Sequence, residues 1–334
     1  MSGGAASATG APAQIAEALI RWDGPMCVIS HHNPDGDAIG STLGLGRLLR
    51  ALGRDVKLLN PDEGVPPDDL AFLMGPGEAI EHEVPADLGD RMLVAVDCAS
   101  EGRMWKGARH RDAKRLLNID HHSDNVAYGD VNLVDPSASS VGEILVRVAE
   151  AAGWPLSPEV ATPLYVAMVT DCGRFGYGNT SPETHRVASV LLEAGVDPAE
   201  INRHLYEDQP LPRLILTGRA LARASRLAGD RLVGAWIDAD DFRESGTDDS
   251  EGIVEILRSA EGASAAVLAR EAGPPGNWRV SLRSARPDLD VAEIAHEAGG
   301  GGHPAAAGFS TRMPPGELFP WVEERVLGAL DGAG

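Results

Sequence analysis

Four short apolar runs in the first 171 residues end directly in an aspartate or a histidine. The runs cover residues 26–30, 93–96, 116–119 and 166–170, and the polar residues that follow them are His31, Asp97, Asp120 and Asp171. Short apolar runs are typical of buried strands, although the last one belongs to a longer helical pattern. Because parallel strands end at one edge of a sheet, polar side chains that follow them converge there. The pattern therefore constrains the fold to a sheet with a polar edge.

Strand-like and helix-like segments alternate through this part of the chain. Strands are predicted at residues 26–30, 55–60, 91–97 and 115–120, and helices at 37–52, 139–152, 158–170 and 182–194. Such alternation is typical of a mostly parallel sheet with helices on both faces. We therefore predict an α/β fold for a first domain at residues 15–196.

A second, smaller α/β domain is predicted after a connector. Residues 197–230 are helical in pattern, contain Pro210 and Pro212, and include a basic stretch at 213–226. The second alternating block has strands at 232–238, 263–270 and 278–284 and helices at 251–260, 291–298 and 316–330. A chain of 334 residues is long enough for two cores. We place the second domain at residues 231–332.

The composition is that of a soluble, intracellular protein. Hydrophobic residues make up 43% and charged residues 24%. No apolar run approaches the roughly 20 residues needed to span a bilayer. Residues 1–13 lack a basic segment and are rich in glycine, alanine and serine, which favours a disordered tail over a signal peptide. The odd number of cysteines, three, argues against a disulfide framework, and we expect a cytoplasmic location.

The formal net charge is -21. This charge is unfavourable for binding long nucleic acids, which normally require a basic surface track. It does not exclude short phosphorylated substrates, because metal ions and a few arginines reverse the field locally. The charge therefore favours a small substrate over a polymer.

The densest polar motif is His31-x-x-x-Asp35-x-Asp37, directly after the first predicted strand. Hard divalent cations prefer carboxylate oxygens, and imidazole suits transition metals. About four aspartates and one or two histidines fit a pair of Mn²⁺-like ions with a bridging carboxylate, which activates water and clamps a phosphoryl group. Two other interpretations stay open: Asn33-Pro34-Asp35-Gly36 is a good turn sequence, and Asp37 is a candidate helix cap. His32 also competes with His31 as the ligand.

The other polar positions have ordinary explanations when each is taken alone. Asp120-His121-His122 resembles a solvated corner after a strand, and a single aspartate such as Asp97 or Asp171 is often a cap or turn residue. The metal interpretation depends on their joint occurrence within one α/β block.

Near the C-terminus a glycine run, Gly299 to Gly302, precedes His303. It is either a flexible hinge or a set of backbone N–H groups that face a phosphate, as in anion-binding nests. Arg283 ends a predicted strand just upstream, and arginine binds phosphate through two parallel hydrogen bonds. Arg283 is otherwise an ordinary surface arginine.

Together these motifs resemble the DHH phosphoesterase family over nearly the whole chain. The matching motifs are His31-His32-Asn33-Pro34-Asp35-Gly36-Asp37, Val96-Asp97, Asp120-His121-His122, Thr170-Asp171-x-Gly173-x-Phe175 and the glycine run that ends in His303. The length and two-domain layout look most like the family's bacterial oligoribonuclease and 3'-phosphoadenosine 5'-phosphate (pAp) phosphatase branch. The resemblance places the active site in a cleft between the domains.

The resemblance implies a role for each matching residue. The ligands of one Mn²⁺ would be His31, Asp35 and Asp97, and those of the other would be Asp37, Asp97, His121 and Asp171. Asp97 would bridge the ions, and His122 would face the scissile phosphate as a catalytic donor or proton carrier. Substrate phosphate or base would be held by Arg283, Ser284, Gly301, Gly302 and His303.

The implied function is Mn²⁺-dependent phosphoester hydrolysis, with Mg²⁺ or Co²⁺ as substitutes. Expected substrates are short RNA oligonucleotides, cleaved to 5'-mononucleotides, and pAp, cleaved to AMP; relatives in some bacteria also hydrolyse cyclic di-AMP or linear pApA. A homodimer is expected, without a membrane partner. The alternatives are a single-strand exonuclease of the same superfamily, an inorganic pyrophosphatase, and a non-catalytic nucleotide-sensing module.

Overall fold

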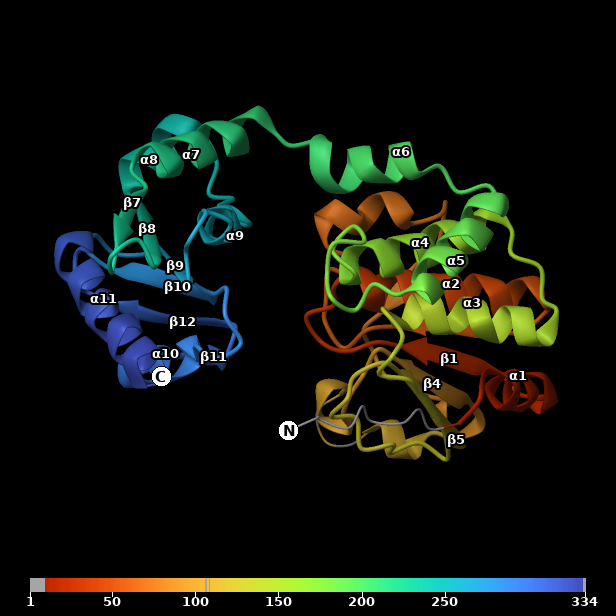
Figure 1. Ribbon diagram of the computed structural model, residues 1–334. Coiled ribbons are helices and arrows are strands. Elements are labelled where there is room, and N and C mark those ends of the chain that lie inside the picture. The colour runs from red at the N-terminus through yellow and green to blue at the C-terminus, as the bar shows by residue number, and fades with distance from the viewer. Residues whose placement is uncertain (1–9, 106, 108, 333–334) are drawn as a thin grey trace. The chain divides into compact units, whose positions relative to one another are not determined.

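The computed structural model describes residues 10–105, 107 and 109–332 (Figure 1). The chain divides between Asp208 and Gln209 into two compact units, called unit 1 and unit 2 below. The first nine residues of the predicted N-terminal tail lie outside the described residues, and helix α1 begins at Pro12, within that predicted tail. The predicted end of the first domain at residue 196 and the predicted start of the second at residue 231 stay predictions. The two units divide within the predicted connector, residues 197–230.

Unit 1 is built on a six-stranded parallel sheet. Its strands are β1 (Met26–Ile29), β2 (Val56–Leu59), β3 (Ile80–Glu81), β4 (Met92–Val96), β5 (Arg115–Asp120) and β6 (Val131–Val134). Their order is β3-β2-β1-β4-β5-β6, and every neighbouring pair is parallel. The predicted fold class is confirmed. The strand order reverses direction at β1, and in open α/β sheets ligands bind at the carboxyl ends of the strands beside such a switch point.

Helices cover one face of this sheet (Figure 1). They are α1 (Pro12–Arg21), α2 (Gly36–Ala51), α3 (Val141–Ala152), α4 (Pro158–Asp171) and α5 (Pro182–Glu193), followed at the end of the unit by α6 (Pro198–Asn202) and a π-helical turn (Arg203–Glu207). The other face is covered mainly by loops and short 3-10 helices, at Leu88–Asp90, Glu101–Arg103 and Arg109–Asp112, where Met104 and Trp105 complete the core. The sequence predicted α-helices on both faces. Residues 97–114 have no helical apolar period, which explains the difference.

Glycines allow α2 to pack unusually closely against α4. A Cβ atom at Gly40 would collide with the carbonyl oxygen of Pro163, and one at Gly44 would collide with Leu164. At the start of α2, a Cβ at Gly36 would meet the side chain of Thr170. The N-terminus of α2 therefore lies beside the C-terminus of α4.

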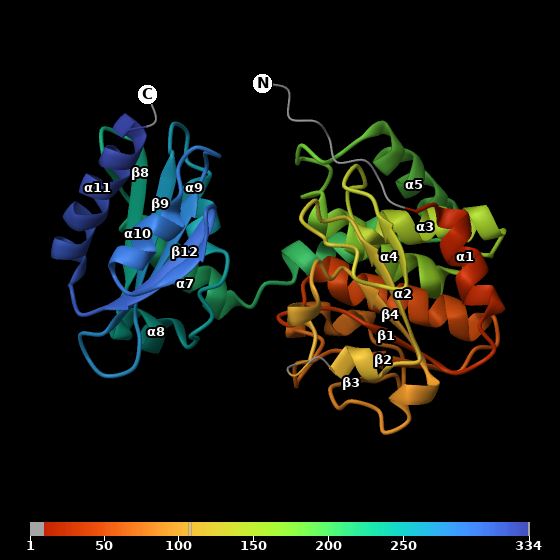
Figure 2. The same ribbon diagram turned by 90° about the horizontal axis from the view of Figure 1, so that it is seen from below.

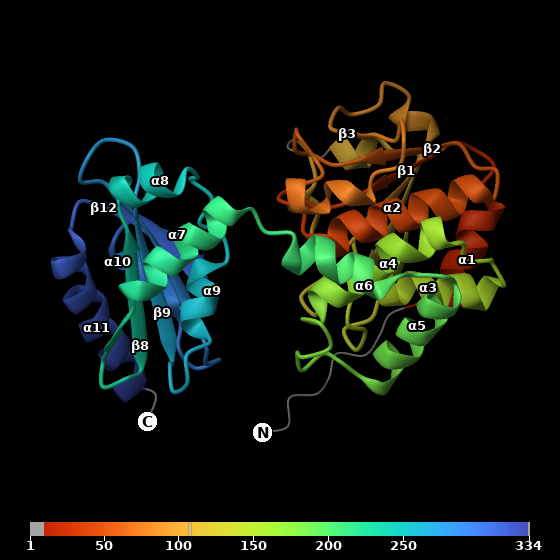
Figure 3. The same cartoon turned by 90° about the horizontal axis from the view of Figure 1, so that it is seen from above.

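Unit 2 contains a mixed six-stranded sheet. Its strands are β7 (Ser225–Leu227), β8 (Leu232–Ile237), β9 (Ala265–Glu271), β10 (Trp278–Ser284), β11 (Gly301–His303) and β12 (Ala306–Thr311), in the order β11-β12-β10-β9-β8-β7. Only β8 and β9 pair in parallel. One face packs on α10 (Val291–Glu297) and α11 (Pro315–Gly332), as Figure 2 shows. The other face packs on α7 (Leu211–Ala222), α8 (Ala239–Ser245) and α9 (Ile253–Arg258), which Figure 3 shows.

The glycine run near the C-terminus enters a β-hairpin. Gly301 and Gly302 pair with Gly308 and Ala307 across β11 and β12. Gly302 has a φ of 147°, and a Cβ there would crowd Ala306 and Ala307. Glycine and alanine have low strand propensity, so pairing of β12 with β10, and of β11 with β12, determines this hairpin and not the local sequence. The second half of the run therefore belongs to a strand, which favours the alternative to a hinge.

No helix in the described ranges has both the length and the apolar character needed to cross a membrane.

The α2–α4 contact can be tested by Gly40→Ala. The added methyl group meets a backbone carbonyl that cannot move aside easily, so the free energy of unfolding should fall by about 1–3 kcal/mol. Gly328→Ala in α11 is the matched control, because nothing lies within 4 Å of a Cβ there and the substitution should stabilise its helix by about 0.5–1 kcal/mol. Urea denaturation followed by circular dichroism measures both. Stabilisation by Gly40→Ala would show that the helices are not in close contact.

Candidate metal centre

The first motif is held between β1 and α2. His31 is only 3% exposed, and its backbone carbonyl accepts a hydrogen bond from Asn60 Nδ2 at 2.9 Å. Asp35 is the N-cap of α2, and its Oδ1 accepts from the backbone N–H groups of Asp37 and Ala38, each at 3.1 Å. The capping role considered for Asp37 therefore belongs to Asp35, whose second carboxylate oxygen remains available.

The structure separates the two adjacent histidines. His31 Nε2 lies 3.3 Å from Asp97 Oδ2, and its Nδ1 lies 2.7 Å from the backbone carbonyl of His32. The His32 ring is exposed, and its Nδ1 is 3.1 Å from the carbonyl of Arg103. Of the pair, His31 is the one that faces the acidic cluster.

Asp37 is buried in the first turn of α2 and is tied to α3. Its carboxylate accepts from the backbone N–H groups of Val141 at 2.7 Å and Gly142 at 3.1 Å, and from Ser41 Oγ at 2.8 Å. The two backbone donors belong to the first turn of α3, where the helix dipole favours a negative charge. These contacts fix the orientation of the carboxylate.

Asp97 follows β4 in the left-handed region, with a φ of 52°. The backbone N–H of Asp97 donates to the Ile119 carbonyl at 3.1 Å, which extends the pairing of β4 with β5 by one residue. The backbone that carries the Asp97 side chain is therefore fixed beside β5. Its Oδ1 is buried and has no hydrogen-bond partner among the described residues. A buried carboxylate oxygen without a partner is costly unless a cation or another donor occupies its free side.

The histidines after β5 point in different directions. His121 Nε2 faces three carboxylates, at 3.5 Å from Asp171 Oδ2, 3.7 Å from Asp97 Oδ1 and 3.9 Å from Asp37 Oδ2. His122 directs Nδ1 toward Asp120 Oδ1 at 2.8 Å, which leaves its Nε2 free. The geometry of His121 suits a metal ligand, and that of His122 suits a group that reaches substrate.

Asp120 itself is fully buried and turned away from the cluster. It accepts from His122 and, on its other oxygen, from Asn125 Nδ2. Asn125 also donates to Asn118 Oδ1 at 2.8 Å, and Asn118 in turn donates to Tyr128 and to the Cys98 carbonyl. This network could not be predicted from the sequence, because isolated asparagines between motifs carry no periodic signal.

The predicted ligands come together in three overlapping groups. In each group, one ligand atom per residue lies within 4.8 Å of the others. The first group is His31, Asp35 and Asp97; the second is Asp37, His121 and Asp171; the third is Asp97, His121 and His122. Asp97 and His121 each belong to two groups. The oxygen-rich donor set and the unpartnered Asp97 Oδ1 fit a hard or borderline divalent cation.

Electrostatics also favour a cation. Burial raises the pKa of Asp37 well above its usual value, and the nearby Asp97 and Asp171 add to the rise. Burial likewise raises the pKa of Asp171 to about 6. Burial opposes ionisation of Asp97 too, but the hydrogen bond from His31 and the histidine charges lower its pKa overall. Carboxylates that repel one another in this way are stabilised when a cation binds.

In unit 2, the predicted substrate-binding residues fall on both faces of the sheet. Arg283 and His303 occupy the same row of β10, β12 and β11, so their side chains share a face. Arg283 Nε donates to Glu255 Oε1 at 2.7 Å. Ser284 points to the opposite face, where it is buried and its hydroxyl donates to the Arg286 carbonyl at 2.7 Å. Gly301 lies on β11 of the same hairpin, where it pairs with Gly308 of β12.

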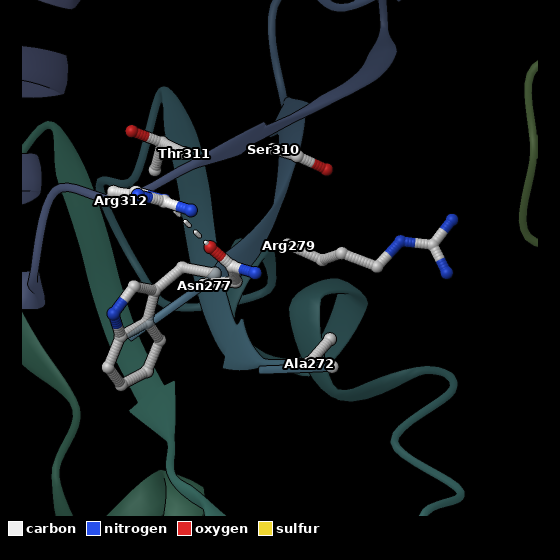
Figure 4. A pocket seen from close by; sticks show the side chains of 8 residues that line it. Ala272, Asn277, Arg279, Ser310, Thr311 and Arg312 are labelled. Carbon is white, nitrogen blue, oxygen red and sulfur yellow. Dashed lines mark hydrogen bonds between the residues drawn. The ribbon is translucent and has the colours of Figure 1, made fainter. Parts of the chain in front are cut away.

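Two further arginines extend this face. Arg270 pairs with Arg279 across β9 and β10, and burial together with the charges of Arg279 and Arg283 lowers the pKa of Arg270. A hollow of about 470 Å³ lies beside them and is bordered by the backbone of Gly299 to Gly301. Figure 4 shows an adjoining hollow of about 550 Å³, where Arg312 Nε donates to Asn277 Oδ1 at 3.3 Å and Arg279 extends away from that pair.

Comparison with known proteins identifies the family. The DHH family N-terminal domain matches residues 25–168, and the DHHA1 domain matches residues 242–318. A Thermus thermophilus protein named bifunctional oligoribonuclease and PAP phosphatase NrnA is 35% identical over 318 residues, which cover 95% of this chain and 92% of the relative. This chain belongs to the DHH family. The resemblance and the predicted enzyme class, a phosphoester hydrolase, are confirmed.

Other DHH proteins are similar over much of their length. The protein of the same name from Bacillus subtilis is 30% identical and covers 90% of this chain and 92% of the relative. The cyclic-di-AMP phosphodiesterase PdeA of Listeria monocytogenes is 27% identical over 95% of this chain but only 49% of that relative. The crystal structure of an exopolyphosphatase-related protein from Bacteroides fragilis shares the fold, with a TM-score of 0.84, 24% identity and 98% coverage of both chains.

Cation binding at this DHH centre should depend steeply on pH. Asp171 has its pKa raised by burial to about 6. Burial lowers the pKa of His31, but the hydrogen bond with Asp97, the Asp97 charge and the His32 carbonyl together leave it raised. Both residues must therefore lose protons before they bind a cation. The apparent affinity for Mn²⁺ should therefore increase as the pH rises from about 5 to about 8, with protons released. Isothermal titration calorimetry in buffers of different ionisation enthalpy measures this. Affinity that is constant over that range would contradict the assignment.

Proposed function

We propose that this DHH protein is a Mn²⁺-dependent phosphoesterase that hydrolyses short RNA oligonucleotides to 5'-mononucleotides and pAp to AMP. Cyclic di-AMP and its linear product pApA are proposed as further substrates. The observation that carries the proposal is the convergence of seven predicted side chains, from residues 31 to 171, into three groups that overlap through Asp97 and His121. The names of the relatives from Thermus thermophilus and Bacillus subtilis support the choice of substrates.

The proposed cofactors are two Mn²⁺ ions, with Mg²⁺ or Co²⁺ as substitutes. The ligands of one ion would be His31, Asp35 and Asp97, and those of the other would be Asp37, Asp97, His121 and Asp171. When bound, the ions supply Lewis-acid activation of the attacking water and neutralise charge on the phosphoryl oxygens. One ligand group in the structure equals the first of these sets, and another equals the second set without Asp97.

His122 is the proposed proton donor to the reacting phosphate. The hydrogen bond with Asp120 raises the pKa of His122 to about 9, so its ring carries a proton at neutral pH. Because Nδ1 is held by Asp120, the free Nε2–H is the group that can donate to a phosphoryl or leaving-group oxygen. Asp120 orients the ring, and Asn125 orients Asp120.

Unit 2 is proposed to bind the rest of the substrate. Arg283, Gly301, Gly302 and His303 would hold its phosphate or base, and the neighbouring Arg270 and Arg279 add positive charge to the same face. Ser284 would contribute by fixing the turn after β10, since its hydroxyl is bound to the Arg286 carbonyl. Such a local basic face within a chain of net charge -21 favours short substrates over long strands. The expected homodimer stays a prediction.

The substrate assignment is tested by product analysis with Mn²⁺ on pAp, a dinucleotide RNA, a long single-stranded RNA, cyclic di-AMP and pyrophosphate. We expect AMP or 5'-mononucleotides from the short substrates, with the long strand slow. Asp97→Ala and Asp171→Ala should abolish turnover because each removes a proposed ligand, while Asp112→Ala, an exposed residue paired with Arg109, should behave as wild type. Fast attack on the long strand, or on pyrophosphate alone, would overturn the choice of substrates.

The orienting network gives a separate prediction. Asn125→Ala removes the hydrogen bond to Asp120 Oδ2, which should lower kcat by about tenfold to a hundredfold while Mn²⁺ uptake is retained. Steady-state kinetics on pAp and calorimetric Mn²⁺ titration measure the two quantities. Asn202→Ala is the control, since that exposed side chain bonds only to Glu207 among the described residues. Wild-type kcat in Asn125→Ala would remove Asn125 from the mechanism.

A further inference from the structure

Arg103 is held beside the metal centre by its backbone. It ends the 3-10 helix Glu101–Arg103, which follows Asp97 after β4. Its carbonyl lies 2.9 Å from the backbone N–H of His32, which donates to it, and 3.1 Å from His32 Nδ1. His32, which belongs to none of the three ligand groups, thus anchors Arg103 next to His31.

The side chain of Arg103 contacts His31 without a true hydrogen bond. Arg103 Nη2 lies 3.0 Å from His31 Nδ1. His31 Nδ1 is also 2.7 Å from the His32 carbonyl oxygen. At that distance Nδ1 must carry a proton and donate it to the carbonyl. A protonated Nδ1 has no lone pair for Arg103, because a guanidinium only donates. The donors of Arg103 are therefore left free at the edge of the cluster.

The acidic side chain closest to Arg103 in the sequence is already occupied. Glu101, two residues before Arg103, accepts from His110 Nε2 at 2.7 Å and from Arg111 Nη2 at 2.9 Å. Within the described residues Arg103 forms no ion pair, whereas neighbouring Arg109 is paired with Asp112 at 2.8 Å. An unpaired, half-buried guanidinium is unusual in a chain with 50 acidic and 29 basic residues.

The charge of Arg103 also reaches both histidines that flank the cluster. For His31 it opposes the rise in pKa that the hydrogen bond with Asp97 produces, and for His122 it opposes the rise caused by Asp120. The guanidinium lies beside the proposed ligand His31, 3.0 Å from its Nδ1, and its charge also acts on the proposed proton donor His122. A reacting phosphoryl group would occupy this region.

We propose that Arg103 binds the non-bridging oxygens of the phosphoryl group that reacts at this centre. The inference rests on the proposed function and adds a cationic residue of unit 1 to it. The planar fork of a guanidinium matches two phosphate oxygens, and its charge stabilises the negative charge that increases on them during the reaction. Arg103 is thus a substrate-binding residue, and the contacts of its carbonyl with His32 hold its backbone in place.

The test compares Arg103→Met, Arg103→Lys and the matched control Arg109→Met. Loss of one preorganised donor to a developing oxyanion typically lowers kcat by about 10²–10³-fold, and we expect Arg103→Met to lower kcat/KM for pAp by a similar factor. Arg103→Lys should recover part of the loss, because it keeps the charge without the fork. Mn²⁺ uptake measured by calorimetry should equal that of the wild type, and Arg109→Met should match the wild type throughout.

A second readout does not depend on turnover. Inorganic phosphate should bind the Mn²⁺-loaded Arg103→Met protein more weakly than the wild type, in calorimetric titration. If Arg103→Met does not fold, Arg103→Gln replaces it in the same measurements. Equal phosphate affinity and equal kcat/KM in the variant and in Arg109→Met would overturn the proposal, and so would loss of Mn²⁺, which would mean that Arg103 acts through His31. The wild-type protein could also hydrolyse none of the substrates and still bind phosphate more tightly than Arg103→Met. That result would refute only the proposed function.

Discussion

The close contact between α2 and α4 is the constraint on which the site depends. Asp37 begins one helix and Asp171 ends the other, so they can face the same ring nitrogen of His121 only if the two helix axes approach closely. Gly36, Gly40 and Gly44 make that approach possible, since a side chain at any of them would separate the helices. The small residues of α2 are therefore as necessary to the centre as the carboxylates.

The cluster is assembled against an electrostatic cost. Burial is the main cause that raises the pKa values of Asp37 and Asp171, and the repulsion between neighbouring carboxylates adds to the rise. Surrounding groups fix each of them before any cation binds: the first turn of α3 holds Asp37, the start of α2 holds Asp35, and β5 holds the backbone of Asp97. Asp120 takes no part in the cluster, because Asn125 and His122 occupy its oxygens. A rigid set of donors of this kind binds a cation without further ordering.

Much of this arrangement could be predicted from the sequence, because it follows from strand ends in a parallel sheet. His31, Asp97 and Asp120 are predicted at the carboxyl ends of strands, and β1, β4 and β5 end there, whereas Asp171 is supplied by the end of α4. Two kinds of feature could not be predicted. The hairpin of β11 and β12 has glycines and alanines with little strand propensity, so only pairing with β10 defines it. Asn125 and Arg103 lie outside the motifs, and their roles depend on distances that no local pattern encodes.

Unit 1 gathers every proposed metal ligand from the first 171 residues, and it ends at Asp208. Domains fold as units during synthesis, with the N-terminal one first. The metal centre can therefore be complete on the ribosome while the residues of unit 2 are still being added. No residue after Asp171 is needed to complete the proposed ligand set, so the order of synthesis allows a cation to bind before unit 2 exists.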